Sequence, residues 1–181
     1  MENLNYILEL LSQSKSNENI TLPSIDKWKE FKYQDIFKIE RGGGYTAREL
    51  SEEKGNTPYI GASAENNGIT LWTNKEPLQK KNAITIANNG SVGSCFYQNL
   101  DFIASSDISI LRLKNREFSP LIALFFVSLI RLEKYRFNYG RKWGMRRMEE
   151  SSIYLPVDEN ENIDFNIIEK YMNTVKYSKF I

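Results

Sequence analysis

The middle of the chain constrains the fold most, because it is a succession of short apolar segments separated by turns rich in glycine and asparagine. Six strands are expected there, over residues 57–63, 69–73, 82–87, 94–98, 102–105 and 108–113. Turn signals such as Asn66-Asn67-Gly68 and Asn88-Asn89-Gly90 separate them. Strands joined by such short turns pair antiparallel. The sequence therefore predicts a twisted, mostly antiparallel sheet.

Helices follow and flank this sheet. Ser119-Pro120 is a helix start, with serine as the N-cap and proline in the first turn, and apolar spacing continues to Leu132. A short helix is expected over 145–150 and a strand over 153–157. Two terminal amphipathic helices carry apolar stripes that we expect to dock on a partner, made of Leu4, Ile7, Leu8, Leu11, Phe165, Ile168, Met172 and Val175. The pattern predicts an α/β fold of the α+β kind, in which helices pack on the sheet.

Three parts follow from this pattern: residues 1–20 as a helix and linker, 21–157 as the main domain, and 158–181 as a closing helix. The chain has 181 residues and no histidine, which excludes Ser-His-Asp triads, Cys-His dyads and histidine metal sites. Cys95 is the single cysteine, so no internal disulfide forms, and a reducing cytoplasm is expected. Its apolar neighbours favour a buried small side chain over a nucleophile.

Membrane insertion is not expected. The longest apolar run, from Leu121 to Ile130, is half of what a membrane span needs, and residues 1–20 lack the pattern of a secretory signal. No cofactor is expected either, since no glycine-rich strand–turn–helix for a nucleotide-like cofactor is present.

Charge is concentrated in one segment of a chain whose net charge is only +1. Residues 131–147 hold seven basic residues and one acidic residue, Glu133, interleaved with aromatic residues and two glycines. Cations attract phosphates, and planar side chains pack on bases or sugars. We therefore interpret this segment as a nucleic-acid-binding surface; the alternative is a solvated helix end with its aromatic side chains in the core.

The candidate contacts to double-stranded DNA come from this segment and from three loops. Cations would hold phosphates or read guanine, aromatic rings would pack on sugar or base, and amides would pair with adenine. The candidates are Arg41, Tyr45, Arg48, Asn66, Asn67, Asn88, Asn89, Tyr139, Arg141, Lys142, Trp143, Arg146 and Arg147.

Two other functions remain open at this stage. Glu52 and Lys54, with a nearby acid such as Asp35, would suit a metal-dependent nuclease, although such a triplet is common on solvated surfaces. Alternatively, the basic segment binds RNA or another polyanion. Competition between duplex DNA, single-stranded RNA and a polyanion separates these functions.

Several segments, taken in order, resemble a target recognition domain, the module of type I restriction–modification specificity subunits and related type IIG and IIB enzymes. The segments are Trp28–Phe31, Asp35–Phe37, Pro58–Ser63, Asn66–Ile69, Ile84–Gly93, Tyr135–Trp143 and Leu155–Asp158. The resemblance covers roughly residues 28–175, and the order and spacing of the segments carry it rather than any single motif.

The resemblance implies an α/β domain that reads one half of a bipartite DNA sequence and has no catalytic site of its own. It implies flanking helices that dock on a DNA adenine methyltransferase subunit, with a restriction subunit as a further partner. A full specificity subunit resembles two such domains joined by long helices, whereas one is present here. The chain is then expected either to form a homodimer about a two-fold axis or to expose its apolar stripes until a partner binds.

Overall fold

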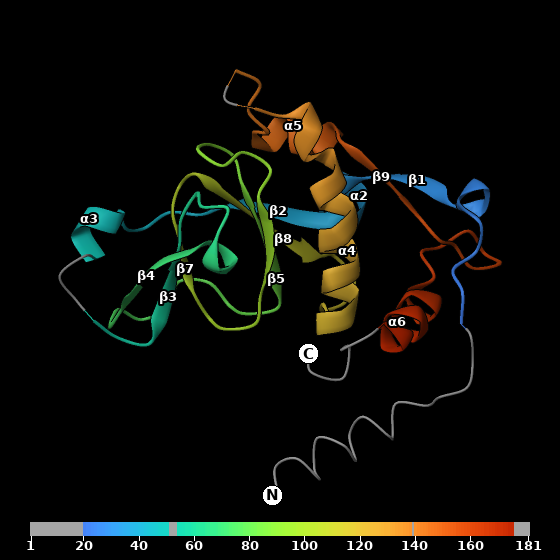
Figure 1. Cartoon of the computed structure of the whole chain (residues 1–181), viewed down its shortest axis with the longest axis horizontal. Helices are drawn as coiled ribbons and strands as arrows, with labels where there is room; N and C mark the ends of the chain where they lie inside the picture. The colour runs from blue at the N-terminus through green and yellow to red at the C-terminus, as the bar shows by residue number, and fades with distance from the viewer. Residues whose placement is uncertain (1–19, 51–53, 139, 176–181) are drawn as a thin grey trace, which may run out of the picture.

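The computed structural model describes residues 20–50, 54–138 and 140–175, and a four-stranded antiparallel sheet lies at its centre. In spatial order the strands are β2 (Phe37–Arg41), β8 (Ile108–Leu113), β5 (Ala83–Ala87) and β6 (Cys95–Gln98). Helix α4 (Pro120–Leu132) packs against β5 and β6 (Figure 1). A three-stranded sheet, in the order β4 (Ile69–Thr73), β3 (Thr57–Ile60) and β7 (Ile103–Ala104), lies on the other side of the domain.

Smaller elements complete the fold. Strands β1 (Lys29–Lys32) and β9 (Ser152–Leu155) form an antiparallel pair. The remaining short helices are η1 (Ile25–Lys27), α2 (Tyr33–Ile36), α3 (Ala47–Leu50), η2 (Asn66–Gly68), η3 (Glu133–Arg136) and α5 (Met145–Glu150). Helix α6 (Phe165–Thr174) is the last described element. In the described part of the chain, no helix is long and apolar enough to cross a membrane.

Strand β5 is buried along its whole length because it separates two hydrophobic cores. Ile84 and Ile86 face the large core beneath α4, whereas Ala83 and Ala87 face a second core that contains Ile60 and Phe102. Alternate side chains of a strand point to opposite faces, so a strand covered on both faces is mostly apolar. The one polar side chain of β5, Thr85, is buried and donates a hydrogen bond to the Phe96 carbonyl at 3.3 Å. Strand β5 thus positions the sheet between α4 and the three-stranded sheet.

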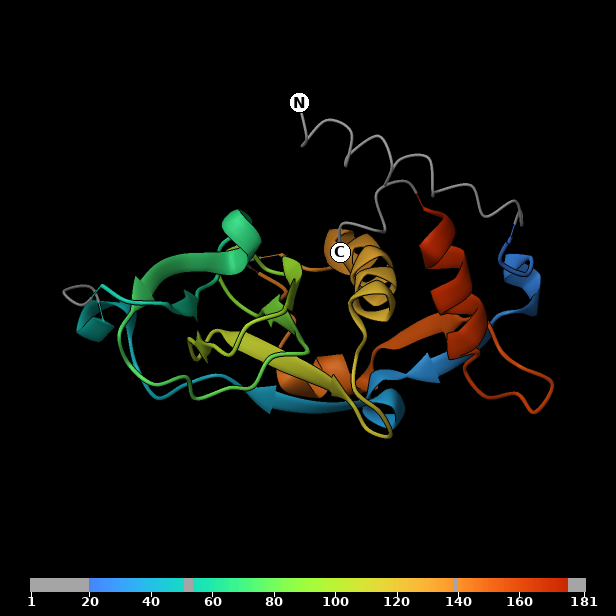
Figure 2. The same cartoon turned by 90° about the horizontal axis from the view of Figure 1, so that it is seen from below.

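Helix α4 begins as its sequence predicts. The Ser119 side chain accepts a hydrogen bond from the Ile122 backbone N–H at 3.3 Å, and Pro120 follows in the first turn. The same hydroxyl donates to Glu169 Oε1 at 2.8 Å, which ties α4 to α6. The two helices lie side by side in both views (Figures 1 and 2).

This packing corrects the prediction that the last helix offers a docking stripe. Ile168 is completely buried, Phe165 stacks on Phe126 of α4 with ring centroids 6.4 Å apart, and Met172 packs on the same core. Val175 is exposed. The stripe therefore stabilises the domain itself. The predicted N-terminal stripe of Leu4, Ile7, Leu8 and Leu11 lies outside the described residues.

Strand pairing confirms the predicted fold class and adds one exception. Within the described residues, all strand pairs are antiparallel except β3 with β7, which run parallel. The helix predicted at 145–150 and the strands predicted at 69–73 and 108–113 have those bounds. The strand predicted at 57–63 ends at Ile60, where its register with β4 shifts.

Candidate nucleic-acid interface

One edge of the central sheet gathers loops from distant parts of the chain, because each strand is antiparallel to its neighbours. Strand β2 ends at Arg41 opposite Ser109 near the start of β8, and β5 ends at Ala87 opposite Ile108. Three loops therefore emerge together, at residues 41–44, 88–94 and 105–107; we name them the loop edge. In Figure 1 the β5–β6 turn of this edge lies beside α5.

Hydrogen bonds fix the loops of this edge to one another. The Asn88 backbone N–H donates to the Asp107 carbonyl at 2.8 Å, and the Ser109 hydroxyl donates to Asn88 Oδ1 at 3.0 Å. Arg41 Nε donates to the Ser106 carbonyl at 2.7 Å. The guanidinium of Arg41, although exposed, is thereby held against the turn between β7 and β8. Such loops present their side chains in a fixed arrangement.

The segment before α5 forms a second wall beside the loop edge. Asn138 and Arg141 exchange backbone hydrogen bonds of 3.2 and 3.0 Å, which closes a tight loop. Lys142, Arg146 and Arg147 follow and are exposed. Arg147 Nη1 donates to the Lys142 carbonyl at 2.9 Å, so this cation is anchored to the loop. Arg146 pairs with Glu150 at 3.1 Å on the exposed surface, where such a pair contributes little stability.

Two adjoining hollows join these walls into one concave surface. The first has a volume of about 320 Å³ and is lined by Arg41, Asn88, Asn89, Ser106, Asp107, Lys142, Gly144 and Met145. The second, of about 540 Å³, is lined by Lys142, Gly144, Met145, Arg146, Arg147 and Glu150. Because three residues line both, the hollows are continuous. Six of the predicted DNA contacts, far apart in sequence, therefore share one surface, which we name the basic hollow.

Trp143 corrects the prediction that its ring packs on DNA. Its side chain is completely buried, its indole N–H donates to Ser151 Oγ at 3.1 Å, and its ring stacks on Phe137. A basic, aromatic-rich sequence does not reveal which aromatic rings enter the core. Tyr139, another predicted contact, lies outside the described residues.

Asn66 and Asn67 lie away from the basic hollow, in helix η2 against strand β6. The Asn67 amide donates to the Tyr97 carbonyl at 3.0 Å and to Gln98 Oε1 at 3.3 Å, and Gln98 Nε2 donates back to the Asn67 carbonyl at 3.0 Å. Tyr97 and Gln98 are at the end of β6 opposite its first residue, Cys95, which adjoins the loop edge. The structure thus gives the Asn67 side chain a role in holding η2 on the sheet.

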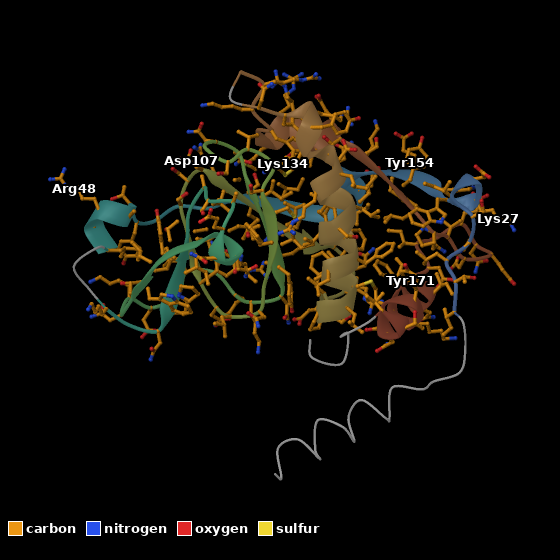
Figure 3. The ribbon with its side chains drawn as sticks, viewed as in Figure 1. Lys27, Arg48, Asp107, Lys134, Tyr154 and Tyr171 are labelled. Atoms are coloured by element: carbon orange, nitrogen blue, oxygen red, sulfur yellow. The ribbon has the colours of Figure 1, made fainter. Side chains whose placement is uncertain are left out.

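Tyr45 and Arg48 lie near α3, on the far side of the loop edge. The Tyr45 carbonyl accepts a hydrogen bond from the Tyr59 hydroxyl at 3.2 Å, and the Tyr45 ring packs on a small core. Arg48 is exposed, and Figure 3 shows it at the outer end of the domain, with Asp107 between it and Lys134. The predicted contacts therefore extend beyond the basic hollow along one side of the molecule.

Two further residues near this surface, Tyr135 and Asp107, were not among the predicted contacts. Tyr135 of η3 is 84% exposed. Its segment abuts the β5–β6 turn, since Lys134 Nζ donates to Ser94 Oγ at 3.4 Å and a Cβ on Gly93 would lie 3.3 Å from the Lys134 Cα. Asp107 lines the hollow among cations. Asp107 was missed because basic and amide residues were taken as the candidates for DNA contacts. Tyr135 was missed because its position in the sequence does not show whether its ring is exposed or buried.

The chemistry of the other candidates is limited. Burial raises the pKa of the Cys95 thiol, so it stays protonated at neutral pH, as expected of a small buried side chain. Asp35 and Lys54, two members of the alternative nuclease site, are exposed, and the third, Glu52, lies outside the described residues. Among residues 20–50, 54–138 and 140–175, no three histidine, cysteine, aspartate or glutamate side chains are placed to hold a metal ion.

Known proteins resemble this chain in both sequence and fold. It is 32% identical over 177 residues to the specificity subunit of the type II restriction enzyme BcgI from Heyndrickxia coagulans, covering 92% of this chain and 51% of that protein. It is 29% identical over 136 residues to a putative type I specificity subunit of Mycoplasma pneumoniae, covering 74% and 37%. The chain thus spans about half, or less, of the length of these relatives.

Solved structures share the fold. The S subunit of a type I restriction–modification system from M. genitalium superimposes with a TM-score of 0.66 at 20% identity, over 85% of this chain and 39% of that one. The HsdS subunit from Thermoanaerobacter tengcongensis gives a TM-score of 0.57 at 14% identity, over 95% and 46%. Residues 25–179 match the family described as the type I restriction modification DNA specificity domain. Because this match covers most of the chain, the protein belongs to the family of type I restriction–modification DNA specificity domains.

Proposed function

We propose that this chain recognises one part of a specific DNA sequence and directs a DNA adenine methyltransferase partner to it. The observation that carries the proposal is the basic hollow, where Arg41, Asn88, Asn89 and Lys142 come together from three separate segments. Membership of a DNA specificity family supports it. The partner would supply the chemistry, and a restriction subunit would act through the same complex.

The walls of the hollow suggest how the two tasks of recognition are divided. Lys142, Arg146 and Arg147 are exposed cations on one wall, suited to phosphate oxygens on one side of a groove. Arg41 lies on the opposite wall, held by the Ser106 carbonyl. Each phosphate that a cation neutralises releases counterions and so makes binding dependent on salt. These contacts would fix the protein on the duplex without selecting a sequence.

The floor of the hollow would select the sequence. Asn88 and Asn89 line the same hollow as Arg41 and Lys142, and amides form paired hydrogen bonds with adenine. Asn88 is oriented by the Ser109 hydroxyl, which limits the directions in which its remaining amide atoms form bonds. Side chains on a fixed turn discriminate between bases better than those on a mobile loop.

One such surface would read one part of a site. The match covers 51% of the BcgI specificity subunit, and a second recognition half would read the other part of the site. Because α6 packs on α4, residues 165–174 are poor candidates for contacts with a partner subunit. Residues 1–20 and the exposed Val175 are the parts of the chain to test for docking.

Methylation in the host cell tests this function. Adenine methylation is mapped across the genome with the gene intact, deleted, and restored with Lys142→Ala and Arg146→Ala together. One sequence motif is expected to lose methylation on deletion and to recover poorly with the double variant. Unchanged methylation after deletion, together with preference of the purified chain for single-stranded RNA over duplex DNA, contradicts the proposal.

A further inference from the structure

Asp107 is the acidic side chain of the first hollow, and its position is fixed by its own backbone. Its N–H donates to Ser105 Oγ at 3.2 Å, and its carbonyl accepts from the Asn88 N–H at 2.8 Å. It therefore belongs to the same rigid group of loops as Arg41 and the asparagine turn. Figure 3 shows Asp107 on the same side of the molecule as Lys134.

A carboxylate in this place cannot serve phosphate binding. An ionised carboxylate accepts hydrogen bonds but donates none, and it repels a phosphate. DNA offers such an acceptor one kind of uncharged donor in the major groove, the exocyclic amine of cytosine N4 or adenine N6. An acidic side chain within a basic surface thus repels phosphates and favours a base whose edge carries an amine.

The neighbouring amide leaves room for such a donor. Asn89 Nδ2 approaches Asp107 Oδ1 at 3.5 Å, the outer limit of a hydrogen bond. Asn89 Oδ1 is buried and has no hydrogen-bond partner in the structure, where nearly all buried acceptors have one. The hollow therefore contains two acceptor groups, a carboxylate with a weak partner and an amide oxygen with none. The carboxylate of Asp107 is suited to a donor that a ligand brings, and the buried Asn89 oxygen lies beside it without a partner of its own.

We propose that Asp107 is a specificity-determining residue that accepts a hydrogen bond from the exocyclic amine of cytosine or adenine. This inference rests on the proposed function. Asn89 acts beside it as a positioning residue that holds the carboxylate toward the base. Arg41 and Lys142, which line the same hollow, offset the repulsion between the carboxylate and the nearby phosphates.

Selection from a pool of random DNA duplexes tests the role of Asp107. The purified chain and its Asp107→Asn and Asp107→Ala variants are compared, with Asp26→Asn as a control of equal charge. Asp26 is exposed in η1, next to Lys27, which Figure 3 shows at the opposite end of the molecule from Arg48. Thermal melting establishes that each variant is folded before selection.

The expected result is a motif in which one cytosine or adenine loses at least about fivefold of its preference in both Asp107 variants, while Asp26→Asn selects the unchanged motif. Replacing that base by an analogue without the amine should weaken wild-type binding and leave Asp107→Ala unaffected. If the Asp107 variants keep the full motif and bind all duplexes more tightly, the carboxylate only repels DNA and the inference is wrong. If the wild type selects no motif, the proposed function fails with it.

Discussion

The indole ring of Trp143 lies flat on the ring of Phe137, with centroids 4.4 Å apart and planes only 8° apart. Tyr33, the first residue of α2, completes the cluster, with its ring centroid 5.8 Å from that of the indole. Trp143 directly follows Lys142, the cation that lines both parts of the basic hollow. Phe137 and Trp143 therefore anchor the basic segment to the core, next to the cations that precede and follow them.

Trp143→Ala should lower the free energy of unfolding by about 3–5 kcal/mol, because it removes a completely buried ring. Tyr135→Ala is the matched variant in the same segment. Its ring is 84% exposed, so stability should change by less than about 0.5 kcal/mol. Urea unfolding of both variants provides the measurement. A Trp143→Ala protein of normal stability that binds DNA poorly would restore the direct-contact interpretation.

Gly90 should be needed for the turn that carries the two asparagines. Its φ is +58°, and a Cβ there would lie 3.1 Å from the Ala62 carbonyl oxygen, so Gly90→Ser should cost roughly 1–2 kcal/mol. Gly144→Ser is the control: its φ is −72°, it precedes α5 as the N-cap, and nothing lies within 4 Å of an added Cβ.

DNA affinity separates the two roles of this turn. If the turn presents Asn88 and Asn89 to DNA, Gly90→Ser should weaken DNA binding by more than its lower stability explains. The affinities of the wild type and the variant are compared well below both melting temperatures, where both proteins are folded. Gly144 lines the basic hollow, so Gly144→Ser is a control for stability alone. A loss of affinity no larger than the lower stability of Gly90→Ser explains would show that the turn serves only the fold.

Ile168→Glu should destabilise the domain severely, because it places an unpaired carboxylate in the core between α4 and α6. Val175→Glu, at an exposed position one residue after α6, should leave stability nearly unchanged. Light scattering and thermal melting are measured on both. If Ile168→Glu instead gave a stable protein with a smaller assembly, the residue would belong to an interface after all.

Cys95 should resist thiol reagents in the folded protein. Burial raises the pKa of its thiol, so the reactive thiolate is scarcer at pH 8 than in an unfolded chain, and the reagent also lacks access. Labelling by a disulfide reagent should be slow in buffer and rapid in urea. Labelling in buffer should remain slow even at pH 9, because the raised pKa keeps most of the Cys95 thiol protonated there. Rapid labelling without denaturant would contradict the burial of β6.

Local sequence predicted those elements whose causes are local. Ser119 caps α4 because its side chain accepts a hydrogen bond from the Ile122 N–H, a free donor of the first turn, and Pro120 lacks an N–H of its own. The packing of α6 was missed because an apolar stripe shows that a face is covered but not what covers it. Ile168 is covered by the domain's own core.

The sequence identified the cations and amides that line the basic hollow, but not that they lie together. Cations and amides in turns are visible in the sequence, whereas their convergence depends on the strand order β2-β8-β5-β6. The same limit applies to two individual residues. Asn67 is polar and lies in a turn, yet its amide bonds Gln98 on a different part of the sheet. Asp107 joins the hollow only because β8 starts beside the end of β5.

The salt dependence of duplex binding tests the central claim most directly. The affinity of the purified chain for a DNA duplex is measured over a range of salt concentrations, for the wild type, for Lys142→Ala with Arg146→Ala, and for Lys27→Ala as a distant control. If the basic hollow holds phosphates, the double variant should flatten the slope of log affinity against log salt by up to about 1.8, roughly 0.9 for each lost contact. The control should keep the wild-type slope. An unchanged slope in the double variant would contradict the assignment of the basic hollow as the DNA-binding surface.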